Sequence, residues 1–125
     1  MTYKILKKHR KLPHRIWIGC YEFDMEIVSA DDVILDGNDG MTVFDVGKRK
    51  IFIAGNLESR RLLSVVWHEV THAINWQRGI TDSSSEEMVA TKHGEAWTQA
   101  LLDNPKLLTW FKKCLKQVVS EKENA

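Results

Sequence analysis

Two histidines spaced four residues apart, with a glutamate directly after the first, are the residues of this chain best suited to chemistry. They lie in the segment HEVTH at residues 68–72. On a helix, positions i and i+4 share a face, so the imidazoles of His68 and His72 would point to one spot and could coordinate a single Zn²⁺ ion at about 2.0–2.1 Å. The carboxylate of Glu69 would lie beside them, where it could accept a proton from an activated water molecule. The pattern therefore predicts one zinc ion on His68 and His72, with Glu69 as the general base.

The simplest alternative is that both histidines face solvent and that Glu69 forms only a salt bridge. The neighbours of the motif argue against this, because they are mostly apolar: Val65, Val66, Trp67, Val70, Ala73 and Ile74. A helix with such neighbours is packed against the rest of the chain, where unpaired polar groups are costly. The metal site is therefore the better interpretation.

A catalytic zinc ion usually has three protein ligands and one open position, so a third ligand is expected. The chain after His72 lacks an H-x-x-G-x-x-H continuation, which excludes the metzincin pattern. Three candidates, Glu86, Glu87 and His93, lie on the next predicted helix. A short loop makes the two helices antiparallel and brings the start of the second near His72, which favours the glutamates. The apolar stripe of that helix places Glu86 inward and Glu87 at its edge, and Glu86 also suits a capping box with Ser83.

The N-terminal half of the chain has the patterns of β-strands. Residues 21–27 alternate strictly between apolar and acidic side chains, which predicts a strand with one face in water. Residues 15–19 lead into this strand, and two further short strands, residues 41–46 and 50–54, are joined around Gly47 as a hairpin. We expect these strands to form a small twisted antiparallel sheet.

The C-terminal half has the periodicity of three helices. The first helix is expected from about Leu57 to Trp76, with Asn56 as its N-cap. The second is expected to begin at one of two capping boxes, Ser83-Glu86 or Ser84-Glu87, and to end near Leu102. The third is expected to begin at Pro105 and to end before a polar tail at residues 120–125. The elements together predict a single α+β domain over residues 1–125, in which the sheet packs on the three helices and the metal lies between the layers.

The segments HEVTHAIN and EEMVATKHG resemble the gluzincin class of zinc metallopeptidases, and especially the small ImmA/IrrE-like and related mini-gluzincins of phages and bacteria. In that class a glutamate on the helix after the motif completes a site of two histidines and one glutamate. In that class this glutamate is followed by a small residue three positions later, a polar residue four positions later and a small residue seven positions later. Glu87 matches this pattern, with Ala90, Thr91 and Gly94 at the three positions. The resemblance covers roughly residues 50–110 and implies a zincin-like fold. It also implies that Glu87 is the third metal ligand and that Thr91 orients one of the histidine ligands.

The same resemblance implies a reaction and a place for the substrate. The reaction is hydrolysis of a peptide bond in a protein or peptide. In zinc peptidases of this kind the strand before the motif helix is a sheet edge that pairs with the extended substrate, in the manner of β-augmentation. Ile51, Phe52 and Ile53 are therefore the expected substrate-binding residues.

Two alternatives to this function stay open. The pattern His93-Gly94-x-x-Trp97 also resembles the third-ligand motif of SprT-like proteases, which would make the site three histidines and would point to substrates on DNA. The metal could instead only staple the helices of a non-catalytic phage regulatory or structural protein. In a peptidase, His93, Arg60 or Arg61 could steady the oxyanion, and the sequence does not choose between them.

Composition and charge narrow the remaining classes. The 125 residues are 43% hydrophobic and 28% charged, which is typical of a globular domain, and the apolar runs are far shorter than the ~20 residues of a membrane span. Residues 1–20 hold six basic and no acidic residues, whereas residues 21–47 hold eight acidic and no basic ones before Lys48. The basic arm at residues 1–14 could contact nucleic acid, but it lacks an accompanying aromatic pattern, so neutralisation within the fold is favoured. Without a secretory signal or a cysteine framework, we expect the cytoplasm of a bacterium or of a phage-infected host.

Overall fold

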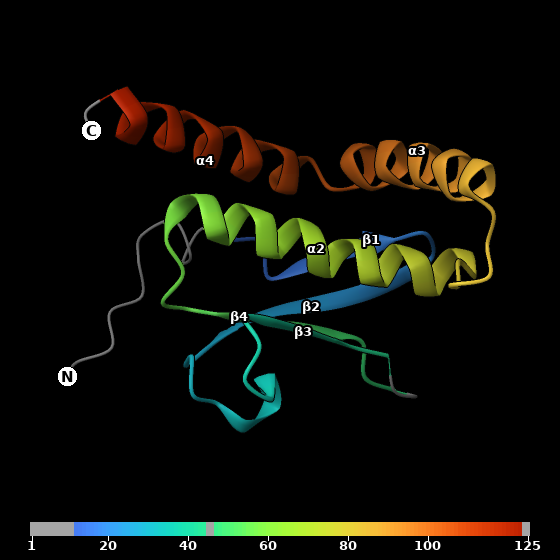
Figure 1. Ribbon diagram of the computed structural model, residues 1–125, viewed down its shortest axis with the longest axis horizontal. Helices are drawn as coiled ribbons and strands as arrows, with labels where there is room; N and C mark the ends of the chain where they lie inside the picture. Colours follow the sequence, from blue (N-terminus) through green and yellow to red (C-terminus); the bar gives the residue numbers. More distant parts are fainter. Residues whose placement is uncertain (1–11, 45–46, 124–125) are drawn as a thin grey trace.

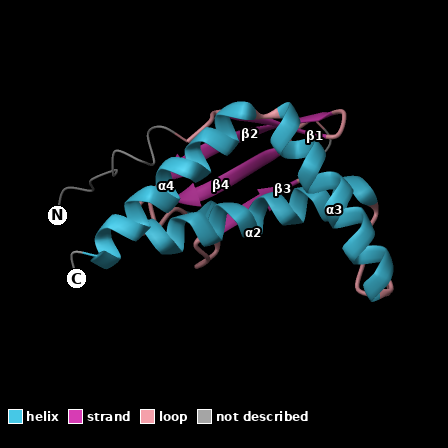
Figure 2. Cartoon of the chain, turned by 90° about the horizontal axis from the view of Figure 1, so that it is seen from above, coloured by secondary structure: helices cyan, strands magenta, loops and turns pink. Residues whose placement is uncertain are grey.

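In residues 12–44 and 47–123, which the computed structural model describes, a four-stranded sheet and three helices form two layers (Figure 1). The strands are β1 (Arg15–Ile18), β2 (Tyr21–Val28), β3 (Gly40–Val43) and β4 (Lys50–Ala54), and a short 3-10 helix, η1 (Val33–Leu35), lies between β2 and β3. The helices α2 (Ser59–Arg78), α3 (Glu86–Asp103) and α4 (Pro105–Glu123) lie on one side of the sheet (Figures 1 and 2). The predicted α+β fold, a sheet from the N-terminal half on three C-terminal helices, is confirmed.

The order of the strands in the sheet is β1-β2-β4-β3. The pairs β1–β2 and β3–β4 are antiparallel, but β2 and β4 are parallel, with Met25 opposite Ile51 and Ile27 opposite Ile53. The sheet is therefore mixed, and the expectation of an antiparallel sheet is wrong for this pair. The route of the chain is the reason: after β2 it passes through η1 to the far edge, and the β3–β4 hairpin then returns β4 to the side of β2.

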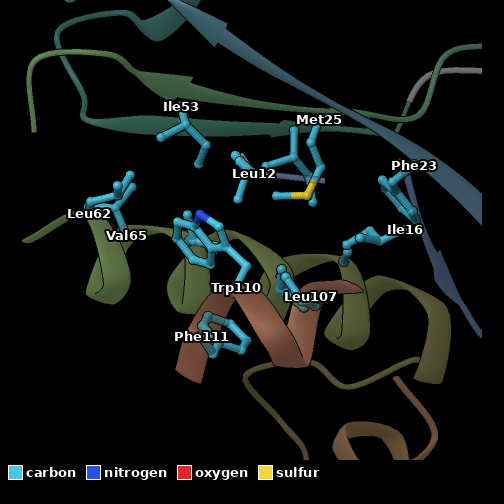
Figure 3. Close-up of a cluster of buried hydrophobic side chains, with 14 of the residues drawn as sticks. Leu12, Ile16, Phe23, Met25, Ile53, Leu62, Val65, Leu107, Trp110 and Phe111 are labelled. Atoms are coloured by element: carbon cyan, nitrogen blue, oxygen red, sulfur yellow. The ribbon is translucent and has the colours of Figure 1, made fainter. Parts of the chain in front are cut away.

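Alternate residues of the strands face the helices and fill the space between the layers (Figure 3). Phe23 and Met25 of β2 are buried, as the alternation of that segment predicts. They belong to the same apolar cluster as Val65 of α2 and Leu107 and Trp110 of α4. This packing fixes the rotation of α2 over the sheet, and so decides which of its side chains remain accessible.

β4 is an inner strand of the sheet rather than the edge that we expected. It pairs with β2 on one side and with β3 on the other, and the side chains of Ile51 and Ile53 are 0% exposed. Ile51, Phe52 and Ile53 therefore cannot pair with an extended substrate at a sheet edge as predicted, because strands on both sides already use the hydrogen-bonding groups of β4. The edge of the described sheet on this side is formed by β3.

The helices start a few residues away from the predicted positions. Glu58 occupies the N-cap position of α2 without a side-chain hydrogen bond, so Asn56 is not the cap. Ser85 caps α3, since its hydroxyl accepts a hydrogen bond from a backbone N–H of the first turn at 3.2 Å. The capping boxes that begin at Ser83 and Ser84 are therefore not the ones used, although the segment that holds them was correctly identified.

The structure describes only part of each end of the chain. The polar tail expected at residues 120–125 is helical as far as residue 123, so α4 is longer than predicted. Most of the basic arm predicted at residues 1–14 lies outside the described residues, but Leu12 is buried in the apolar cluster (Figure 3). None of the described helices is both long enough and apolar enough to cross a membrane.

Asn104, in the junction between α3 and α4, ties the helical layer to β1. Its Oδ1 accepts a hydrogen bond from the backbone N–H of Trp17 at 2.8 Å, and its Nδ2 donates to the Trp17 carbonyl at 2.8 Å. Nδ2 also lies 2.7 Å from the carbonyl of Ala100, one turn earlier in α3. The side chain is buried, and these three bonds pair its polar atoms with backbone groups of β1 and α3.

Candidate metal centre

His68 and His72 lie one turn apart on α2, on the side of the helix that the core leaves accessible. Both side chains are exposed, whereas Val66, Val70 and Ala73 of the same helix are fully buried. The Nε2 atoms of the two histidines face each other at 3.1 Å, and the ring planes are nearly perpendicular. The predicted convergence of the two imidazoles on one spot is therefore present.

This separation suits two nitrogens on one metal ion. Two Zn–N bonds of about 2.05 Å at a tetrahedral angle place the nitrogens roughly 3.3 Å apart. Ligand atoms of His68, Glu69 and His72 all lie within 4.8 Å of one another, and no further His, Cys, Asp or Glu of the described residues joins this group. The three side chains could therefore hold a metal ion, and the two neutral imidazoles are donors that suit zinc.

The carboxylate of Glu69 is held between the histidines and the sheet. Glu69 is only 5% exposed, and its Oε2 lies 3.9 Å from Nε2 of His68. The hydroxyl of Thr42, in β3, donates to Oε1 of Glu69 at 2.9 Å and lies 3.1 Å from the backbone carbonyl of the same residue. One oxygen is thus fixed by the edge strand, while the other points toward the histidines.

Gly40, two residues before Thr42, allows the edge strand to approach this carboxylate. A Cβ atom at position 40 would lie 2.7 Å from Cγ of Glu69, 3.0 Å from its Cδ and 3.0 Å from a methyl group of Val65. Such distances are too short for a side chain of any size to fit without displacement. Because alternate residues of a strand share a face, Gly40 and Thr42 act from the same side, one by leaving space and the other by donating a hydrogen bond.

A pocket of about 570 Å³ opens over this group, between β3 and α2, which run beside each other (Figure 2). His68, Glu69 and His72 line this pocket together with Asn38, Asp39, Gly40, Met41, Thr42, Phe44, Arg61, Ser64 and Val65. Asp39 and Arg61 form an ion pair at 2.9 Å across one side of the pocket. The candidate ligand atoms thus line a pocket whose other lining residues are apolar, polar and charged.

The remaining candidates for the third ligand lie outside this group. Glu86 and Glu87 are exposed in the first turn of α3. His93, farther along α3, has its Nε2 2.7 Å from Oδ1 of Asn75 on α2, so it cross-links the two helices instead. The described structure does not bring Glu87, Glu86 or His93 into the group at His68, and the assignment of Glu87 stays a prediction.

Sequence reasoning missed the residues that β3 and the preceding turn contribute. In the sequence, Asp39 and Gly40 belong to the segment DGNDG at residues 36–40, whose residue types are typical of a turn, and Thr42 lies in the strand predicted at residues 41–46. The signal that was present is the spacing of Gly40 and Thr42, which puts both on one face of the strand. Of the two arginines considered for the oxyanion, Arg61 lines the pocket, whereas Arg60 lies on another side of α2.

Comparison of the chain with models of known protein families, with characterised proteins and with solved structures finds no match. The resemblance to gluzincins therefore rests on the motif residues themselves.

Proposed function

We propose that this protein is a zinc-dependent peptidase that hydrolyses peptide bonds. The observation that carries the proposal is the geometry of one group: two Nε2 atoms 3.1 Å apart, with the buried carboxylate of Glu69 beside them, in the lining of a pocket. On the resemblance to gluzincins, Glu87 is the proposed third ligand, and a fourth position is left for the reaction. When bound, zinc supplies Lewis-acid chemistry that makes a peptide carbonyl and a water molecule more reactive.

Glu69 is the proposed general base. Its Oε2 lies on the side of His68, so it can accept the proton of a water molecule as the oxygen attacks the carbonyl carbon. The same carboxyl group then gives that proton to the leaving amine as the C–N bond breaks. The hydrogen bond from Thr42 keeps the carboxylate oriented through both transfers.

The edge strand β3 is the proposed docking line for the substrate. Gly40, Met41 and Thr42 line the pocket, and within the described sheet β3 is paired only with β4. An extended peptide can add to such an edge by backbone hydrogen bonds, which would place its carbonyl groups above the metal ligands. Arg61, at the wall of the pocket, is better placed than Arg60 or His93 to meet a developing oxyanion.

The substitution Glu69→Gln tests the proposal. We expect the variant to bind zinc like the parent but to cleave a mixture of unstructured peptides, followed by mass spectrometry, at least about a hundredfold more slowly. Glu58→Gln, at an exposed glutamate before α2, is the matched control and should cleave like the parent. If the parent binds one equivalent of zinc and cleaves no peptide, the non-catalytic alternative with a stapling metal is correct instead.

A further inference from the structure

Helix α4 carries two apolar stripes, and only one of them is used inside the described structure. Leu107, Trp110 and Cys114 belong to the buried stripe that packs in the core. The second stripe lies at Leu108, Lys112, Leu115 and Val119, where the three apolar side chains are 36%, 52% and 54% exposed. Its three apolar residues are seven and four positions apart, so they lie along one side of α4, as residues that contact another helix do.

A groove runs beside this second stripe. Between α2 and α4 it has a volume of about 540 Å³ and an almost entirely apolar wall made of Leu63, Trp67, Leu101, Leu108, Phe111 and Leu115. Trp67 stacks on Trp97 at 3.7 Å, which gives the groove a rigid aromatic side. A second shallow groove continues along α4 past Leu115 to Val119. From Leu108 to Val119 the surface extends roughly 16 Å, which is three turns of a helix.

The charges at this groove are all basic. Arg60 and Lys112 line the groove itself, and Lys113 and Lys116 line its continuation. None of these four side chains forms an ion pair with another residue in the described part of the chain. A second copy of this chain would bring lysines against lysines, which disfavours self-association through this surface.

We propose that this groove binds an acidic amphipathic helix of another protein. The partner helix presents apolar side chains at three- and four-residue spacing to Leu108, Leu115 and Val119, and carries carboxylates that face Arg60 and Lys112. A concave groove with a seam of this spacing suits a helix better than it suits a flat lipid surface. The inference is independent of the peptidase proposal, because His68, Glu69 and His72 do not line this groove.

Two synthetic helices of about three heptads test the inference by fluorescence anisotropy. The acidic probe has leucines at the seam positions and glutamates beside them, and the basic probe has a lysine in place of every glutamate. We expect the parent protein to bind the acidic probe at least about tenfold more tightly than the basic one. The double variant Lys112→Glu/Lys116→Glu leaves two basic residues against two glutamates and should abolish this preference. Leu115→Asp should weaken binding of the acidic probe at least about tenfold.

Val33→Asp is the matched control, because Val33 in η1 is 92% exposed and lies away from the groove, and it should bind like the parent. A thermal melt of each variant confirms that it is folded. The inference is overturned if the parent binds both probes equally, if it binds neither, or if the charge variant keeps the parent's preference for the acidic probe. A dimer that Leu115→Asp dissolves would assign the groove to a second copy, and lysine-dependent binding to phosphatidylserine vesicles without probe binding would assign it to a membrane. Either result overturns the inference too.

Discussion

The α-carbon of Gly40, in β3, lies directly against the side chain of Glu69, in α2, so that a methyl group on it would be 2.7 Å from Cγ of Glu69. We predict that Gly40→Ala forces the carboxylate and the strand apart. Overpacking of this kind costs about 1–3 kcal/mol in the free energy of unfolding. Denaturant unfolding measures this loss, and peptide cleavage by the zinc-loaded variant should fall with it.

Gly94→Ala is the control for this substitution. Gly94 lies inside α3, and a Cβ atom there would meet no atom within 4 Å. Alanine should therefore stabilise the protein by about 0.5–1 kcal/mol, because it restricts the unfolded chain and favours the helix. If Gly40→Ala were also stabilising, the close approach of β3 to Glu69 would be wrong.

Thr42→Val should separate metal binding from catalysis. The substitution keeps the shape of the side chain but removes the hydroxyl that donates to Oε1 of Glu69 at 2.9 Å. Since a hydrogen bond to a charged group contributes about 1.5–3 kcal/mol, we expect kcat to fall roughly ten- to a hundredfold. Zinc affinity should change little, and Thr42→Ser, which keeps the hydroxyl, should retain most of the activity. Equal loss in both variants would contradict the positioning role of Thr42.

Zinc titration of five alanine variants should sort the metal ligands. We expect His68→Ala and His72→Ala to weaken zinc binding at least about a hundredfold, since loss of a residue that only hydrogen-bonds to a metal ligand already lowers metal affinity about 10–100-fold. His93→Ala should bind zinc like the parent, because His93 contacts Asn75. Glu87→Ala should lose affinity and Glu86→Ala should not. Full zinc binding by Glu87→Ala would remove that residue from the site.

Asn104→Ala should be among the most destabilising substitutions outside the core. It removes two part-buried hydrogen bonds to the backbone of Trp17 and a buried one to the carbonyl of Ala100, and with them the link between the helices and β1. We expect the free energy of unfolding to fall by about 2–4 kcal/mol, measured by denaturant unfolding. Asn56→Ala, at an exposed asparagine that does not cap α2, is the control and should change the stability by less than about 0.5 kcal/mol.

Much of this fold could be predicted because local patterns specify local structure. The alternation from Tyr21 to Ile27 correctly predicted a strand with Phe23 and Met25 inside, since a period of two is a property of the strand alone. The spacing of His68 and His72 likewise required only a helix for both rings to meet. Helix starts were less certain, because consecutive serines each offer a similar cap and only Ser85 has the right backbone position.

Long-range pairing could not be predicted from such patterns. Nothing in the residues of β4 distinguishes an inner strand from an edge, and its insertion between β2 and β3 depends on the path of the whole chain. For the same reason the approach of Gly40 and Thr42 to Glu69 was missed: those residues are far apart in sequence and meet only after the hairpin has docked beside α2. The bond from Asn104 to Trp17 also joins segments that no local pattern connects.

Because Thr42 lies on an edge strand, binding of a peptide in the pocket would change the rigidity of the strand that holds Glu69. In the described sheet β3 has a neighbouring strand on one side only, so it has fewer hydrogen bonds than an inner strand and opens more easily. A peptide that docks along that border would give the strand a second row of hydrogen bonds and stiffen the very support on which Glu69 rests. Binding of the peptide would then also orient the Glu69 carboxylate. Short peptides that do not reach the edge of β3 should therefore be cleaved slowly even when they bind.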